Sequence, residues 1–97
     1  MTVVLIAEIP NGSYEQYLEV NRKAEVDDNP PDGLIIHTAG RMENGGGLRI
    51  VDVWDSREAY DRFDEERLGP ALREAMPEMP ADAPGPQFHE VENTIQP

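Results

Sequence analysis

Hydrophobic positions along the chain alternate between a strand-like period and a helix-like period. Residues 2–9, TVVLIAEI, are rich in β-branched side chains and end at the turn-forming residues 10–12, so they predict a buried strand. Ser13 is followed three residues later by Gln16, which is the spacing of a capping box, and a helix is therefore expected to run from there to about Asp27. The DDNPPDG segment that follows predicts a loop, because its prolines lack amide protons.

The second half of the pattern adds two strands, a helix and a final strand. Residues 34–41 and 48–54 predict strands joined as a hairpin, and residues 87–96 alternate weakly as a last strand. Between them, Asp55 or Ser56 is expected to cap a helix. That helix should run to about Leu68, break or kink at Gly69-Pro70 and end with a short turn from Pro70 to Met76. The proline-rich residues 77–86 predict an extended surface segment.

This order of elements predicts one domain over residues 1–97 with an α+β, ferredoxin-like fold. In that βαββαβ architecture a four-stranded antiparallel sheet carries both helices on one face. Strict alternation along the hairpin makes both faces of the sheet largely apolar, so we expect a homodimer in which a second subunit covers the open face. One face is expected to hold Leu34, Ile36, Thr38, Val51 and Val53, and the other Ile35, Ala39, Leu48, Ile50 and Trp54.

The register of the hairpin decides which polar groups meet on it. If Asn44-Gly45 forms a two-residue type I′ turn, His37 lies opposite Asp52. A turn at Gly45-Gly46 would instead place His37 opposite Trp54 and diagonal to Asp52. Both registers keep the three side chains on one face, and only an odd loop or a bulge would separate them.

A His37–Asp52 pair beside Ile50 and Trp54 has two interpretations. A carboxylate that accepts from one imidazole nitrogen fixes the tautomer and leaves the other nitrogen as a base near neutral pH. Alternatively, the two polar groups satisfy each other inside an apolar interior and serve stability alone. Tyr14, Tyr17, Asn21, Tyr60 and Phe63 lie on the inner sides of the predicted helices, where they would form either core or pocket.

Composition narrows the classes of partner. Eight basic and 20 acidic residues give a formal net charge of −12, which repels nucleic acid and anionic membrane surfaces. The absence of cysteine excludes a disulfide, a thiolate nucleophile and a cysteine-ligated metal. The apolar start is interrupted by Glu8 and Pro10, so it predicts neither a signal peptide nor a membrane span, and a cytoplasmic location is expected. His89 and Glu92 would point to opposite faces of a strand, and no metal or other cofactor is expected.

Residues 33–72, GLIIHTAGR…LRIVDVWDSREAYDRFDEERLGPAL, together with FHEVENTI, resemble small bacterial proteins of the dimeric α/β-barrel superfamily. The likeness is to a subgroup near the antibiotic-biosynthesis monooxygenase-like proteins. It implies two ferredoxin-like subunits that form a barrel, each with a pocket between sheet and helices. His37, Asp52 and Trp54 match the strand motifs of the subgroup. Haem-degrading members of the superfamily are a poorer match, because His37 and His89 both fall on predicted strands.

Two functional hypotheses follow from the pair and the resemblance. In the first, the protein is a cofactor-independent monooxygenase or cyclase that acts on an apolar aromatic or polyketide-type substrate. His37, oriented by Asp52, is then the base, and the pocket is shaped by Trp54, Ile50, Tyr14, Tyr17 and Phe63. In the second, the protein is a non-catalytic ligand-binding or accessory dimer in which His37 and Asp52 form a structural pair.

Overall fold

The computed structural model describes residues 1–10, 13–43, 46–76 and 85–95 of the chain. Its strands are β1 (Val3–Pro10), β2 (Leu34–Arg41), β3 (Gly47–Trp54) and β4 (Gln87–Glu90). Its helical segments are α1 (Tyr14–Ala24), α2 (Arg57–Phe63), the π-helix η1 (Asp64–Leu68) and α3 (Gly69–Ala75).

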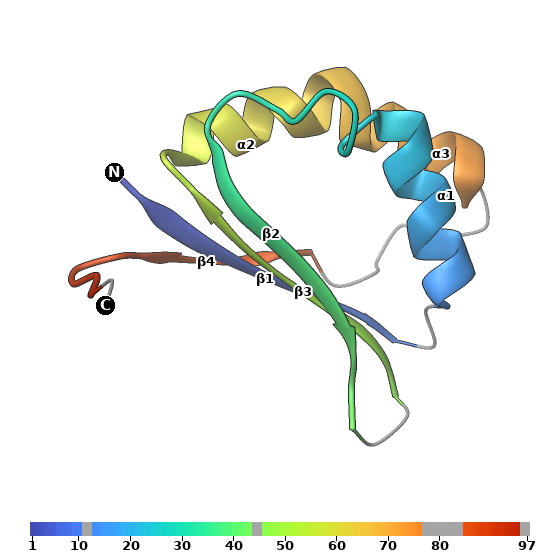
Figure 1. Ribbon diagram of the computed structural model, residues 1–97, viewed down its shortest axis with the longest axis horizontal. Coiled ribbons are helices and arrows are strands. Elements are labelled where there is room, and N and C mark those ends of the chain that lie inside the picture. The colour runs from blue at the N-terminus through green and yellow to red at the C-terminus, as the bar shows by residue number, and fades with distance from the viewer. Residues whose placement is uncertain (11–12, 44–45, 77–84, 96–97) are drawn as a thin grey trace.

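The four strands form one antiparallel sheet with the order β2-β3-β1-β4. Helix α1 and the α2–η1–α3 run lie on the same face of that sheet, and no helix of the described residues lies on the other face (Figure 1). This arrangement confirms the α+β, ferredoxin-like fold expected from the order of the elements.

Helix α1 begins where the capping box predicts. The Ser13 hydroxyl accepts the N–H of Gln16 at 3.1 Å, and the Gln16 side chain accepts the N–H of Ser13 at 3.4 Å. The helix ends at Ala24, three residues before the expected end, because Glu25 adopts a left-handed conformation with φ 58°. The N–H of Val26 then returns to the carbonyl of Asn21, which closes the last turn and buries the Val26 side chain.

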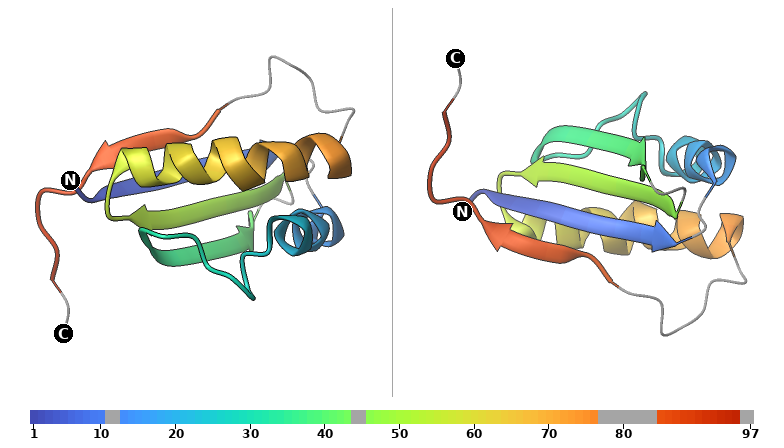
Figure 2. Two further views of the ribbon diagram at one scale, coloured as in Figure 1. Left: turned by 90° about the horizontal axis from the view of Figure 1, so that it is seen from above. Right: turned by 90° about the horizontal axis from the view of Figure 1, so that it is seen from below.

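The prediction at Gly69-Pro70 was a break or a kink, and the break is absent because the second helical run continues across these residues. Ser56 caps α2 by accepting the N–H of Ala59, as one of the two expected caps. Residues 64–68 then widen into a π-helix, in which the N–H of Gly69 reaches back to the carbonyl of Asp64. The wide turn accommodates the proline within a continuous helical run that reaches Ala75 (Figure 2). Gly69 is required there, because a Cβ would lie 2.9 Å from the Asp64 carbonyl oxygen.

The hairpin register is the first of the two predicted: His37 pairs with Asp52 and Arg41 with Leu48. The turn residues 44 and 45 themselves lie outside the described residues. Near the start of β2, Leu34 pairs with Trp54 but Ile36 pairs with Val53, so a β-bulge leaves Ile35 without a partner of its own.

The bulge corrects the predicted assignment of faces. Leu34 packs against the core, on the same side as His37, whereas strict alternation had placed it with Ile36. Ile35 and Ile36 are both exposed, although Ile35 had been expected beside Ala39 and Trp54. One extra residue reverses the faces of the residues before it, because strand side chains alternate with a period of two.

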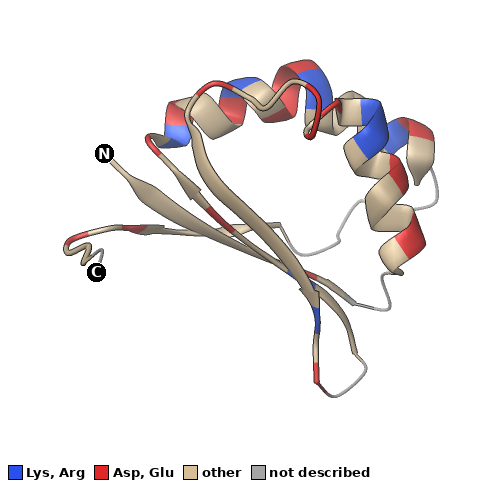
Figure 3. Cartoon of the chain, viewed as in Figure 1, with Lys and Arg blue, Asp and Glu red and all other residues tan. Residues whose placement is uncertain are grey.

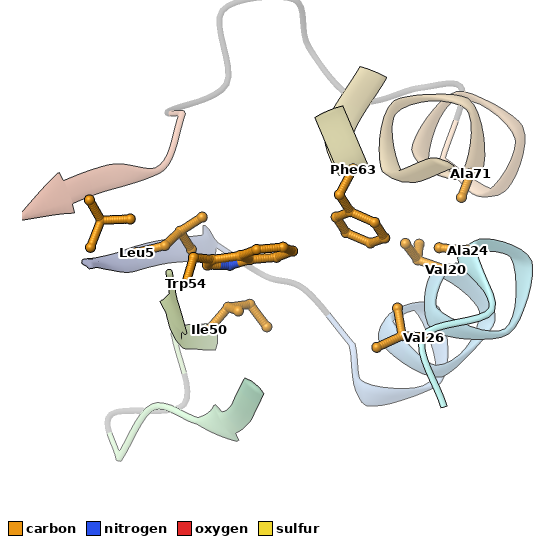
Figure 4. Packing of buried hydrophobic residues seen from close by; sticks show 9 residues of the cluster. Leu5, Val20, Ala24, Val26, Ile50, Trp54, Phe63 and Ala71 are labelled. Carbon is orange, nitrogen blue, oxygen red and sulfur yellow. The ribbon is translucent and has the colours of Figure 1, made fainter. Parts of the chain in front are cut away.

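The core lies between the sheet and the helices. Trp54, 1% exposed, and Ile50 point from the sheet towards Phe63 and Val20 on the helices (Figure 4). Asp52 is the one buried charged residue in the described part of the chain.

Strand β4 stops at Glu90 rather than continuing to residue 96. Its partner β1 begins at Val3, which pairs with Glu90, and one further bond from the Val91 N–H to the Thr2 carbonyl ends the contact. The expected extended segment at 77–86 lies mostly outside the described residues.

Charged side chains gather on the helices and at the ends of the strands, while the middle of the sheet is nearly free of them (Figure 3). The sheet face that carries no helix includes Val4 and Ile6 of β1, Val51 and Val53 of β3, and Ile36 of β2. Over the described ranges, no helix is long and apolar enough to cross a membrane.

A substitution at Gly33 tests the loop that leads into β2. Gly33 has φ +91°, and a Cβ there would lie 2.5 Å from the Ala59 Cβ on α2. We expect Gly33→Ala to lower the free energy of unfolding by about 3 kcal/mol, from left-handed strain and overpacking together. Urea denaturation measures this. Gly40→Ala is the matched control, since a Cβ at Gly40 meets nothing within 4 Å; equal losses in the two variants would contradict the assignment.

Candidate functional site

A cavity of about 200 Å³ lies between the core face of the sheet and the helices. Strands β1, β2 and β3 provide one wall, and α1, α2, η1 and α3 provide the other. Most of the lining is apolar, and its polar part includes His37, Asp52, Tyr17 and Asn21. A cavity of this size holds a compound of one or two rings, since a 150 Å³ apolar cavity accommodates benzene.

Four side chains form a connected hydrogen-bond chain along the cavity wall. The Tyr17 hydroxyl lies 2.6 Å from His37 Nε2, and His37 Nδ1 lies 2.6 Å from Asp52 Oδ1. The Trp54 indole N–H donates to the other carboxylate oxygen of Asp52 at 3.3 Å. Both imidazole nitrogens are therefore occupied, and the chain ends at a phenol on α1.

The sequence places these groups through three local features. The hairpin register puts His37 and Asp52 directly opposite each other on β2 and β3. Trp54 follows Asp52 by two residues and therefore shares its face. Tyr17 sits one turn into α1, where the N-cap at Ser13 sets the rotation of the helix, and its ring stacks on the imidazole at 5.8 Å and 12°.

The partners of His37 assign its tautomer. A carboxylate only accepts, so Nδ1 carries the proton and donates it to Asp52. Nε2 is then the acceptor, and the Tyr17 hydroxyl donates to it. Each oxygen of the buried Asp52 carboxylate therefore has a hydrogen-bond donor, because the indole N–H occupies the second one.

Burial shapes the acidity of the two tyrosines at the cavity. The pKa of Tyr17 is raised above its ordinary value chiefly by burial; hydrogen bonding to Asn21 lowers this pKa, and the negative charges of Asp27 and Asp52 raise it. Burial also raises the pKa of Tyr60, and the nearby Asp64 adds to the shift. Both phenols therefore remain protonated donors at neutral pH.

Six of the seven residues predicted for the site line the cavity: His37, Asp52, Trp54, Ile50, Tyr17 and Phe63. Tyr14 does not; it is 43% exposed, stacks on Tyr17 at 5.8 Å and lies under the Arg41 guanidinium. His89 is exposed on β4, opposite Val4.

Sequence reasoning missed the bond from Tyr17 to His37 and the place of Asn21 beside it. Tyr17 and Asn21 both lie on the predicted inner face of α1. Helical periodicity was the one sequence signal that placed them on the same side. Tyr60, which was expected on the inner side of its helix but was not among the residues predicted for the site, also lines the cavity and packs edge-on against Trp54 at 5.5 Å.

No family model matches the sequence, and no curated protein matches it either. Solved structures do match over nearly the whole chain. The protein Rv0793 of Mycobacterium tuberculosis superimposes with a TM-score of 0.70 at 15% identity, covering 99% of this chain and 100% of that one. SnoaB of Streptomyces nogalater, a cofactor-independent oxygenase, gives 0.66 at 14% identity, with 97% and 95% covered.

The monooxygenase from ActVA-Orf6 of Streptomyces coelicolor, solved in complex with nanaomycin D, gives a TM-score of 0.65 at 20% identity. The match covers 99% of this chain and 91% of that one. The chain therefore shares its fold with these solved structures and with one named as an antibiotic biosynthesis monooxygenase from Chloroflexus aurantiacus. The fold implied by the resemblance in the strand motifs is thereby confirmed.

Asp52→Asn tests how far the buried carboxylate supports the fold. The amide has one accepting oxygen in place of two, so either His37 or Trp54 loses its acceptor. We expect the free energy of unfolding to fall by roughly 1–3 kcal/mol, as for a buried donor left without a partner. Thermal or urea denaturation reads this out. Asp61→Asn, on the exposed surface of α2, is the control; equal stability of wild type and Asp52→Asn would show that the carboxylate is dispensable for folding.

Proposed function

We propose that the protein is a cofactor-independent monooxygenase that binds a small apolar aromatic substrate and deprotonates it with the His37–Asp52 pair. The observation that carries the proposal is the position of this pair on the wall of a cavity rather than inside a filled core. The fold shared with a cofactor-independent oxygenase and with a monooxygenase that binds nanaomycin D supports the same activity.

The pair supplies a base in an apolar setting. The Asp52 carboxylate holds the imidazole with Nε2 as the basic nitrogen and stabilises the imidazolium that forms when a proton arrives. The apolar wall excludes water from the ionised substrate, and no lysine or arginine lies among the described lining residues. A phenol or enol that enters neutral and ionises in place fits these surroundings better than a substrate with a carboxylate.

Deprotonation prepares the substrate for dioxygen. The resulting phenolate or enolate is electron-rich, and attack of one of its carbons on dioxygen forms a C–O bond and, after protonation, a hydroperoxide. Loss of water then leaves a carbonyl, so one oxygen atom enters the product and the other leaves as water. The substrate supplies all four electrons that reduce dioxygen and both hydrogens of the water, which is why such a reaction needs no flavin or haem.

A specific observation also favours a second candidate, a non-catalytic ligand-binding dimer. Both nitrogens of His37 are already hydrogen-bonded within the protein, as expected for a pair that satisfies itself. In that case the cavity binds an apolar molecule without turning it over, and the quenching of Trp54 fluorescence would report binding alone.

Oxygen uptake separates the two candidates. With 1-naphthol, a two-ring phenol of the size the cavity accepts, we expect uptake that rises with protein concentration. His37→Ala should lower the rate by roughly 100-fold or more, the usual contribution of a general base. An oxygen electrode makes the measurement, and His89→Gln, which changes the other histidine outside the cavity lining, is the control. Uptake that His37→Ala leaves intact would overturn the catalytic role.

The apolar sheet face supports a homodimer. Ile36 is 54% exposed there, among valines and isoleucines of the neighbouring strands, and an uncovered face of this kind is unfavourable in water. Two sheets that pack through it would form the barrel expected from the resemblance, with one cavity in each subunit.

Sedimentation velocity tests the dimer. The wild-type protein is expected to sediment as a dimer of 10.9 kDa subunits, and Ile36→Glu as a monomer, because two copies of the new charge would be buried against an apolar face. Leu18→Glu is the control: Leu18 is 47% exposed but lies on α1, on the opposite side of the sheet. A monomeric wild type, or an Ile36→Glu dimer, would contradict the assembly.

A further inference from the structure

We infer that Tyr17 is the residue that receives the proton of the substrate, and that His37 acts through it. This inference rests on the proposed function, which names the His37–Asp52 pair as base without saying how a substrate reaches it. The observation behind it is the contact of 2.6 Å between the Tyr17 hydroxyl and His37 Nε2.

Neither nitrogen of His37 is open to a ligand. Nδ1 is held by Asp52 and Nε2 by Tyr17. A substrate could reach Nε2 directly only if the Tyr17 side chain moved away. Displacing it would break a short hydrogen bond inside a partly buried site, whereas a relay through the hydroxyl needs no movement.

The hydroxyl of Tyr17 can take part in such a relay. A phenol oxygen has one donor and two acceptor positions. The donor is used on His37. The neighbouring Asn21 side chain lowers the pKa of the phenol, because it favours negative charge on that oxygen. An acceptor position on the same oxygen is available to a substrate hydroxyl in the cavity, which both Tyr17 and Asn21 line.

The transfer balances without any further reactant. The substrate O–H gives its proton to the Tyr17 oxygen while Tyr17 gives its own proton to His37 Nε2. The products are a substrate anion, a neutral Tyr17 and an imidazolium paired with the Asp52 carboxylate. Because burial raises the pKa of Tyr17, the two protons move together and no free tyrosinate accumulates.

A chromogenic phenol tests the relay without requiring turnover. 4-Nitrophenol has one ring, fits the cavity volume, and absorbs visible light only as its phenolate. Binding is followed by quenching of Trp54, the one tryptophan of the chain and a lining residue, and ionisation by the phenolate absorbance. The wild-type protein, at a pH where the free probe is mainly neutral, is expected to bind it and increase the ionised fraction.

Tyr17→Phe removes only the hydroxyl and retains the ring that stacks on His37. We expect this variant to bind the probe but to lower the ratio of ionised to neutral bound probe about tenfold or more, a shift of about one pKa unit, because no hydroxyl then connects the probe to His37 Nε2. Tyr14→Phe is the matched control, because it removes the same hydroxyl from the neighbouring ring, which does not line the cavity. Should Tyr17→Phe fail to fold by urea denaturation, Asn21→Leu serves instead, with a smaller fall expected.

The outcomes separate the relay from the proposed function. If Tyr17→Phe, or Asn21→Leu in its place, ionises the bound probe as well as the wild type does, the relay is wrong, while His37 as a direct base survives. If the wild type binds the probe but leaves it neutral, the relay is also wrong, and oxygen uptake with 1-naphthol decides the monooxygenase separately. A wild type that does not bind the probe at all contradicts both proposals.

Discussion

The carboxylate of Asp52, 6% exposed inside an apolar core, is the group on which the geometry of the site depends. Burial of a charge is costly unless donors surround it, and here the imidazole of His37 and the indole of Trp54 provide one donor to each oxygen. Those two contacts fix the tautomer of His37 and the orientation of the tryptophan ring. The direction of the Tyr17 hydrogen bond follows, because a deprotonated Nε2 is an acceptor and the hydroxyl must donate to it.

The sequence contained enough information for the β2–β3 half of this arrangement. An even hairpin register places His37 opposite Asp52, and period-two alternation adds Trp54 to the same face, so local chemistry determined three of the four members. The bulge at Ile35 lay outside such reasoning, since nothing in an apolar run marks where an extra residue enters. It left the His37–Asp52 pair intact because it lies on the far side of His37 from the turn.

The contact from α1 could not be derived in the same way. Periodicity shows that Tyr17 and Asn21 face inward, but the strand that they meet depends on how the helix packs across the sheet, which is a property of the whole core. The second helical run is a similar case. Local rules predict a break or kink in the helix at Pro70. The π-helix at 64–68 instead keeps Leu68 and Leu72 on one continuous helical run that lines the cavity.

A polar cluster of this kind in a filled core would have no role other than a structural one. Replacing such a cluster with apolar groups of similar shape is frequently neutral or stabilising, so its presence is weak support for a purely structural role. Here the cluster borders a cavity and its outermost member is a phenol, a group that can both donate and accept. If the hydrogen-bonded cluster served stability alone, any donor could occupy Nε2 of His37. Proton transfer to His37 instead requires a group that gives up its own proton and accepts another, and a phenol hydroxyl does both.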